Sequence, residues 1–190
     1  MIAALLLAAG ASRRFGGPKL LQSVRGASIV RWSAEAALAA ADQLLVVVPP
    51  EHAELRTALD GLDVRFVVNE RTEDGMGSSL ACGVRAAGPN VDAALVVLAD
   101  EPELPADSYR RVIRRYRDGG VQIVAATYAG QRGHPVLFDC AVFPELVALT
   151  GDEGARRVVD RDTGRLVFVE IGDQRPIDVD TREDLARLLR

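Results

Sequence analysis

The sequence predicts a three-layer α/β fold with a mostly parallel central sheet. Short aliphatic runs recur along the 190 residues, and segments with helical spacing of apolar residues separate them. Continuous apolar runs of this length are typical of parallel strands that helices cover on both faces. No linker, repeat or low-complexity tract interrupts the alternation. We therefore expect a single domain over residues 1–190.

Seven aliphatic runs are the expected strands of this sheet. They are Ile2–Ala8, Gln43–Val48, Val64–Val68, Ala93–Leu98, Gln122–Thr127, Pro135–Phe138 and Leu166–Glu170. In an open α/β sheet the ligand lies beyond the carboxyl ends of the strands. The loops that follow these runs are therefore where we expect a site.

The intervals between the strands fit helices. The first interval carries Ile29, Trp32 and Ala36 at near-helical spacing, and Pro105 suits the first turn of a later helix. The last helix has Asp180 or Thr181 as its expected N-cap. The expected helices are Ser28–Ala41, Pro50–Leu59, Ser78–Ala87, Pro105–Arg117 and Glu183–Leu189.

Composition and charge exclude two classes of partner. The net charge is −4 and the sequence pI is about 5.3, whereas nucleic-acid-binding domains are usually strongly basic. Aromatic residues make up 5%, too few for a base-stacking surface. The apolar runs are far shorter than the roughly 18 residues of a membrane-spanning helix. We expect no nucleic-acid partner, no membrane partner and a cytoplasmic location.

The loop after the first expected strand combines glycines with cations. It reads LAAGASRRFGGPK over residues 7–19 and matches neither GxGxxG nor the phosphate-binding GxxxxGK[ST] pattern. Gly10 lets backbone N–H groups approach an anion, and Arg13, Arg14 and Lys19 add positive charge. Lys19 is the only lysine among 23 lysine and arginine residues, and its compact ammonium suits a point contact with a polyphosphate. The loop predicts a phosphate-binding site.

Asp100 lies at the carboxyl end of an expected strand. Pro102 favours an extended conformation for the residue before it, so Asp100 is not inside a helix. Its carboxylate is a hard oxygen ligand that suits Mg²⁺. A turn-stabilising aspartate is the alternative.

Asp180 has two interpretations as well. Alternation over residues 177–180 puts Ile177 and Val179 on one face and the aspartates on the other. Asp180 followed by Glu183 also fits a helix cap, which needs no metal.

Together, six segments resemble one enzyme family. Residues 7–19 resemble the LAAGxSxRxGxxK signature of the MobA-like nucleotidyltransferases related to molybdenum cofactor biosynthesis. Further segments resemble its molybdenum cofactor cytidylyltransferase branch in the same order: GMGSSL at 75–80, LADEP at 98–102, RGHPVLF at 132–138, GDEGAR at 151–156 and IDVDT at 177–181. The resemblance implies a Rossmann-like nucleotidyltransferase fold and Mg²⁺-dependent transfer of CMP from CTP to the terminal phosphate of molybdopterin, with release of pyrophosphate.

The resemblance also implies roles for individual residues. Arg13, Lys19 and Asp100 are the expected catalytic residues, and Asp100 and Asp180 the expected Mg²⁺ ligands. The expected nucleotide-binding residues are Leu7, Ala8, Ala9, Gly10, Arg13, Arg14, Lys19, Gly75, Ser79 and Gly83.

Base and acceptor recognition leave several alternatives open. Ala9 stands where the guanylyl branch has glycine, which favours cytosine. Gly83 lies inside an expected helix, where it fits either close packing or close ligand approach. His134 and Arg156 are the expected acceptor-binding residues, the latter near a helix that could begin at Asp152. A structural histidine and an exposed arginine are the alternatives.

Three other functions stay open, because fold alone does not decide chemistry. The first is a guanylyl or other NTP transferase of the same family. The second is an NAD(P)H-dependent reductase on the same fold, which would bind NADPH and tolerate Asp100→Ala. The third is a carrier or chaperone that hands the cofactor to a molybdenum hydroxylase, which would bind that partner without turnover.

Overall fold

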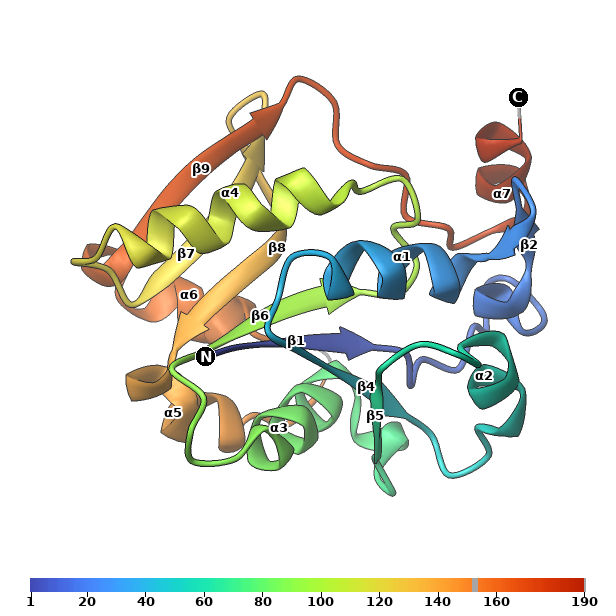
Figure 1. The fold of residues 1–190 in the computed structure, drawn as a ribbon, viewed down its shortest axis with the longest axis horizontal. Helices are drawn as coiled ribbons and strands as arrows, with labels where there is room; N and C mark the ends of the chain where they lie inside the picture. The colour runs from blue at the N-terminus through green and yellow to red at the C-terminus, as the bar shows by residue number, and fades with distance from the viewer. Residues whose placement is uncertain (152–153, 190) are drawn as a thin grey trace.

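A seven-stranded sheet runs between two layers of helices in the computed structural model, which describes residues 1–151 and 154–189 (Figure 1). The strand order is β5-β4-β1-β6-β8-β7-β9. The strands are β1 Ile2–Leu7, β4 Gln43–Val48, β5 Arg65–Val68, β6 Ala93–Leu98, β7 Ile123–Tyr128, β8 Gln131–Asp139 and β9 Leu166–Gly172, with a separate hairpin of β2 Ser23–Val24 and β3 Ala27–Ser28. The expected mostly parallel α/β sheet is confirmed.

The helices divide between the two faces of the sheet. One face is covered by α1 Ile29–Leu38, α2 Ala53–Ala58, α4 Ala106–Arg117 and α7 Arg182–Leu188. The other is covered by α3 Met76–Ala87, α5 Phe143–Val147 and α6 Arg156–Arg161. Within residues 1–151 and 154–189, none of the helices has the length and apolar character that crossing a membrane requires.

The central strand β1 contributes to two separate cores. Ala4 and Leu6 pack under α1 on one face, whereas Ala3 and Leu5 pack under α3 on the other, and all four are fully buried. This alternation is the period of two that an extended strand imposes. Burying one leucine side chain contributes about 1.5–3 kcal/mol. The apolar runs are therefore continuous because both faces of the sheet are covered.

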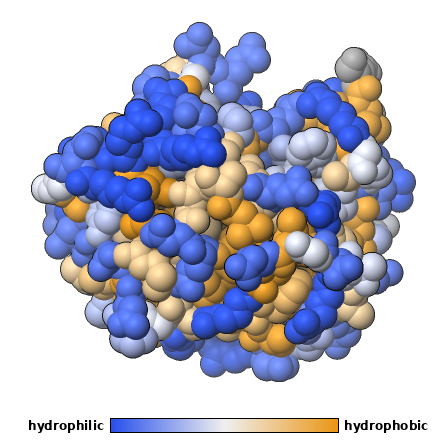
Figure 2. All heavy atoms as spheres, in the orientation of Figure 1, coloured by the Kyte–Doolittle hydropathy of each residue, from blue (hydrophilic) through white to orange (hydrophobic). Residues whose placement is uncertain are grey.

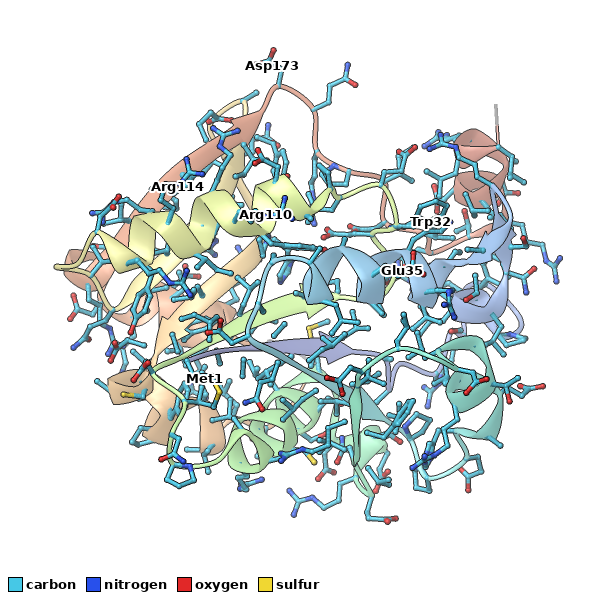
Figure 3. The ribbon with its side chains drawn as sticks, in the orientation of Figure 1. Met1, Trp32, Glu35, Arg110, Arg114 and Asp173 are labelled. Carbon is cyan, nitrogen blue, oxygen red and sulfur yellow. The ribbon has the colours of Figure 1, made fainter. Side chains whose placement is uncertain are left out.

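Hydrophilic side chains gather over α4 on the outer face of the molecule (Figure 2). Arg110 and Arg114 are exposed and project from this helix (Figure 3). The Arg110 guanidinium donates to the Ala39 carbonyl at 2.9 Å. The opposite side of α4 buries Val112 and Ile113 against the sheet. The arginine-rich stretch is thus the solvent face of an amphipathic helix.

Strand β8 begins earlier than the sequence indicates. It runs antiparallel to both β6 and β7 and starts at Gln131 rather than Pro135. Ala129 and Gly130 join β7 to β8, both with positive φ, at 47° and 76°. Two consecutive residues of this kind form the tight turn that suits a two-residue hairpin. The hairpin escaped prediction because Ala129 gives no turn signal.

The cap of α7 corrects one expectation about Asp180. The Thr181 hydroxyl accepts from the Asp184 N–H, and the Asp184 carboxylate accepts from the Thr181 N–H at 2.9 Å. This reciprocal pair is a capping box. The prediction of a cap formed by Asp180 and Glu183 is therefore wrong. The Asp180 side chain has other partners.

We expect Thr181→Ala to lower the free energy of unfolding by about 1 kcal/mol, because an N-cap hydroxyl is lost. Urea unfolding at neutral pH measures this change. Thr181→Ser keeps the hydroxyl and is the matched control. Equal losses in the two variants would contradict the capping assignment.

Candidate functional site

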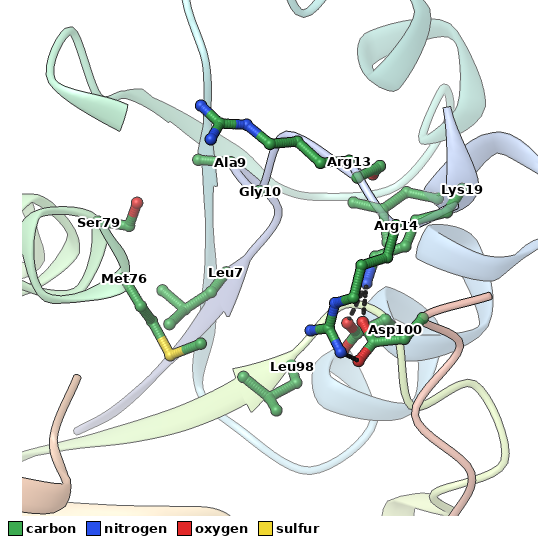
Figure 4. Close-up of a pocket in the computed structure, with 13 residues that line it drawn as sticks. Leu7, Ala9, Gly10, Arg13, Arg14, Lys19, Met76, Ser79, Leu98 and Asp100 are labelled. Atoms are coloured by element: carbon green, nitrogen blue, oxygen red, sulfur yellow. Dashed lines mark hydrogen bonds and ion pairs between the residues drawn. The ribbon is translucent and has the colours of Figure 1, made fainter. Parts of the chain in front are cut away.

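A cavity of about 280 Å³ opens beyond the carboxyl ends of β1 and β6 (Figure 4). Four segments line it: the end of β1 with the loop that follows, the start of α3, the end of β6 with its loop, and Asp180 in the segment that leads to α7. The lining residues are Leu7, Ala9, Gly10, Ser12, Arg13, Arg14, Lys19, Leu20, Met76, Ser79, Leu98, Asp100 and Asp180. Nine of the residues predicted for nucleotide or metal binding are among them.

Lys19 lies between the two aspartates of this cavity. Its Nζ is 2.6 Å from Asp100 Oδ2 and 3.1 Å from Asp180 Oδ1. Arg14 Nη1 is 2.8 Å from Asp180 Oδ2. The Lys19 side chain is 11% exposed and that of Arg14 is 76% exposed. The aspartates therefore share one buried cation, and Asp180 has a second, solvated one.

The surroundings of Lys19 keep it charged. Burial works to lower the pKa of its ammonium, but the charges and hydrogen bonds of Asp100 and Asp180 outweigh burial and raise the pKa above its ordinary value. Leu20, the next residue in the short 3₁₀ helix Lys19–Leu21, belongs to the hydrophobic core and is only 6% exposed. Lys19 is thus a fixed positive charge on an anchored segment of chain.

A backbone hydrogen bond brings the two aspartates together. The Val179 N–H donates to the Asp100 carbonyl at 3.0 Å, and the Val179 side chain is fully buried. The segment that leads to α7 therefore runs beside the loop after β6. Asp180 follows Val179 directly and faces Lys19 for this reason.

The donor set of Asp100 and Asp180 fits a hard divalent cation. Their carboxylates converge on one point, where Lys19 Nζ now lies. Over residues 1–151 and 154–189, no group of three or more His, Cys, Asp or Glu side chains could hold a metal by itself. Mg²⁺ typically binds one or two carboxylates together with water and substrate phosphates. The pair is thus half of such a site, and a phosphate ligand would complete it.

Glu101 adds little negative charge to this pair. Its side chain is 1% exposed directly after Asp100. Burial raises the pKa of its carboxyl well above the usual range, and the nearby Asp178 and Asp100 charges raise it further. These effects favour the neutral form of Glu101.

The opposite end of the cavity has fewer charged groups, and in Figure 4 the Arg13 guanidinium extends toward it above Ala9. Leu7, Ala9 and Ser79 lie there, away from Asp100 and Lys19 (Figure 4). The cavity therefore has a charged end, with Arg14, Lys19 and both aspartates, that suits phosphates, and a less charged end that suits a base or ribose.

Three residues predicted to bind nucleotide do not line this cavity. Ala8 is buried, and its N–H donates to the Val47 carbonyl at 2.9 Å. Gly75 precedes α3 with φ of 82°. A Cβ at Gly83 would lie 3.0 Å from Val47 Cγ2. Close packing of α3 on the sheet is thus sufficient reason for glycine at that position.

A second cavity, of about 430 Å³, contains both residues expected to bind the acceptor. Its lining residues are Met76, Arg132, Gly133, His134, Val136, Ala155, Arg156, Val159 and Arg175. Met76 lines both cavities. Arg132 Nη1 is 2.6 Å from Asp160 Oδ1, and Arg175 Nη2 is 3.2 Å from Asp178 Oδ2. Arg156 is the first residue of α6, and Asp152 lies outside the described residues.

His134 is neutral in this second cavity. Burial lowers the pKa of its imidazole to about 4, and the positive charge of Arg175 adds to that effect. Its Nδ1 is buried without a hydrogen-bond partner among the described residues. A neutral ring with a free nitrogen can still bind a ligand.

Sequence reasoning missed Asn69 and Arg175. Asn69 is 4% exposed and comes directly after β5. A polar residue immediately after an expected strand was a usable signal, because site residues gather at strand ends. Arg175 lies in an irregular segment between β9 and α7, where no periodic pattern could place it.

Comparison with known proteins identifies the family. Residues 4–166 match the family model described as the MobA-like NTP transferase domain. The chain belongs to this family. The resemblance seen in the sequence is confirmed at that level, and the family supports a nucleotidyltransferase class.

Three known proteins are similar to this chain. Purine catabolism protein PucB of Bacillus subtilis (strain 168) is 31% identical over 191 residues, which cover 95% of this chain and 92% of PucB. A 2-C-methyl-D-erythritol 4-phosphate cytidylyltransferase of Streptomyces avermitilis is 32% identical over 136 residues, which cover 65% of this chain and 53% of that enzyme. The solved structure of Rv0371c from Mycobacterium tuberculosis H37Rv has a TM-score of 0.86 at 31% identity and covers 99% and 96% of the two chains. Rv0371c has also been solved as a complex with manganese, with a TM-score of 0.86 at 28% identity over 99% and 97% of the chains.

We expect acid to destabilise the protein through His134. Its pKa in the folded state, about 4, lies below the ordinary value of 6.5, so between these values the unfolded chain binds a proton that the folded chain excludes. The free energy of unfolding should fall by about 1–2 kcal/mol more between pH 7 and pH 5 in the wild type than in His134→Gln. Urea unfolding at both pH values measures this difference. His52→Gln, at the other histidine, is the matched control, and parallel losses in wild type and His134→Gln would contradict the assignment.

We expect Lys19→Met to tighten Mn²⁺ binding in the absence of nucleotide by about tenfold or more, because the ammonium no longer competes for Asp100 and Asp180. The free energy of unfolding without metal should fall, since the two carboxylates then repel each other. Calorimetric titration with MnCl₂ and urea unfolding measure the two effects. Weaker Mn²⁺ binding in Lys19→Met would contradict the shared site.

Proposed function

We propose that this protein transfers CMP from CTP to a phosphate of a molybdopterin-type acceptor, with Mg²⁺ and with release of pyrophosphate. The observation that carries the proposal is the position of Lys19 between Asp100 and Asp180, at one end of a cavity whose other end holds Leu7, Ala9 and Ser79. This division matches the two halves of a nucleoside triphosphate. A cytosolic location, where such nucleotides are available, belongs to the same proposal.

The nucleotide would lie along the cavity with its phosphates toward Arg13, Arg14 and Lys19. Its base would lie between Ala9 and Ser79. The sequence identity of 32% to a cytidylyltransferase supports cytosine, as does Ala9 in place of the glycine of the guanylyl branch. A guanylyl transferase remains the alternative within the family.

Asp100 and Asp180 would hold the metal. When bound, Mg²⁺ would polarise the α-phosphorus and offset the repulsion between two phosphate groups. The manganese complex of Rv0371c supports a divalent cation. Lys19, once released from the aspartates, would face the phosphate oxygens as a compact positive charge.

The acceptor would occupy the second cavity, which joins the first at Met76. Arg132, Arg156 and Arg175 offer planar guanidinium groups that suit a phosphate. A phosphate monoester is already anionic at neutral pH, so its oxygen needs no general base. That oxygen would form a bond to the α-phosphorus of CTP while the bond between the α-phosphorus and the bridging oxygen breaks, and the electron pair would leave with pyrophosphate.

We expect CTP with Mg²⁺ to raise the thermal stability of the protein more than GTP, ATP, UTP or NADPH. A ligand at 100 times its Kd adds about 2.7 kcal/mol. The increase should vanish in Asp100→Ala, because one of the two metal ligands is lost, and should remain in Asp63→Ala, an exposed aspartate outside the cavity. Thermal unfolding with each nucleotide, with and without Mg²⁺, measures this.

Each other outcome selects a different function. A GTP-selective increase would contradict cytosine specificity, and an increase with NADPH alone would point to the reductase. No increase with any nucleotide would leave the carrier for a molybdenum hydroxylase as the better hypothesis. A selective CTP response would then be followed by a turnover assay with the molybdopterin acceptor.

A further inference from the structure

Asn69 links the end of β5 to the start of α3. Its Nδ2 is 2.9 Å from Ser78 Oγ and 3.0 Å from Ser79 Oγ. Its Oδ1 accepts a hydrogen bond from the Arg71 N–H at 3.0 Å. The side chain is buried, and Asn69 is 4% exposed. The two contacts with the serines are therefore buried, and the contact with Arg71 is partly buried.

The direction of these hydrogen bonds follows from the Arg71 N–H. A backbone N–H can only donate, so the amide oxygen of Asn69 must face it, and the amide nitrogen must face the serines. Both amide protons then go to the serines, whose hydroxyl oxygens accept them. Ser78 Oγ also lies 2.6 Å from the Arg71 carbonyl and 2.8 Å from the Gly75 carbonyl. Its own proton is therefore used within the protein.

The proton of Ser79 is different. Ser79 lines the nucleotide cavity and is 6% exposed. Its oxygen accepts from Asn69, and over the described part of the chain no protein oxygen accepts its proton. The hydroxyl can thus donate to a ligand at the end of the cavity away from Asp100 and Lys19 (Figure 4).

We infer that Asn69 is a positioning residue that makes Ser79 a hydrogen-bond donor to the nucleotide base. This inference rests on the proposed function, which puts the base at this end of the cavity. The subsite takes the acceptor at N3 of a pyrimidine base, because O2 is an acceptor in both cytosine and uracil. Cytosine presents two adjacent acceptors, N3 and O2, whereas uracil carries a proton on N3. Asn69 therefore contributes to the preference for cytosine without touching the nucleotide.

Calorimetric titration with CTP, UTP and pyrophosphate, each with Mg²⁺, tests the inference. Ser79→Ala should weaken CTP binding about five- to tenfold, the usual effect of one lost hydrogen bond in a buried site. Ser79→Thr keeps the hydroxyl and should bind CTP within about threefold of the wild type. Pyrophosphate, which occupies only the charged end, should bind equally well to the wild type, Ser79→Ala and Ser79→Thr.

Asn69→Asp tests the positioning itself. A carboxylate accepts the Ser79 proton instead of donating to its oxygen, so CTP binding should weaken about as much as in Ser79→Ala, with pyrophosphate binding unchanged. In the Ser79→Ala background the same change should have little further effect, since the two residues act as one unit. Asn90→Asp makes the same chemical change at an exposed position and is the control.

The outcomes separate this inference from the proposed function. If the wild type binds pyrophosphate but prefers another nucleotide to CTP, the proposed function fails. If it prefers CTP and Asn69→Asp binds CTP as the wild type does, the inference fails. Equal weakening of CTP and pyrophosphate in Asn69→Asp, or additive effects in the double variant, would show a general structural role and also overturn the inference.

Discussion

The ion pairs of Lys19 with Asp100 and Asp180 are the constraint on which the site depends. Two carboxylates that point at the same small volume repel each other, and a buried ammonium removes that repulsion. The surrounding chain is organised to hold this arrangement. Leu20 anchors the segment that carries the cation, and Val179 holds the second aspartate beside the first. The capping box of α7 does not use the Asp180 carboxylate, which pairs with Lys19 and Arg14 instead.

The start of α3 is the second organising element, because both cavities meet there. The Gly77 N–H donates to the Gly151 carbonyl, and the Gly151 N–H donates to the Asp74 carbonyl, both at 2.9 Å. A Cβ at Gly77 would lie 2.9 Å from the Gly151 oxygen. The chain around Gly151 therefore contacts directly the helix whose first turn lines the first cavity. Met76, at the first position of the helix, forms part of both walls.

Much of this organisation was predictable from the sequence. The aliphatic runs predicted all seven strands of the main sheet, because burial on both faces leaves a strong apolar signal. The loop over residues 7–19 was recognisable because it combines glycines with three cations, and Asp100 because it follows an expected strand. The short helix α5, of five residues, was not expected, since it is too short to show a helical period. Asn69 was missed because its role depends on two serines in another element.

The reversed direction of β8 determines which part of that strand reaches the site. Val136 lies opposite Val96 of β6 in an antiparallel register, so the beginning of β8, with Arg132 and His134, lies at the edge where β1 and β6 end. The two cavities are thus built from different kinds of segment. Loops that follow parallel strands line the first cavity, and the beginning of β8, in the β7–β8 hairpin, lines part of the second. A change in the length of the turn at Ala129 and Gly130 would move Arg132 and His134. It would leave Lys19, Asp100 and Asp180 in place. The groups that line the second cavity can therefore change within this architecture while the cluster of Lys19, Asp100 and Asp180 stays as it is.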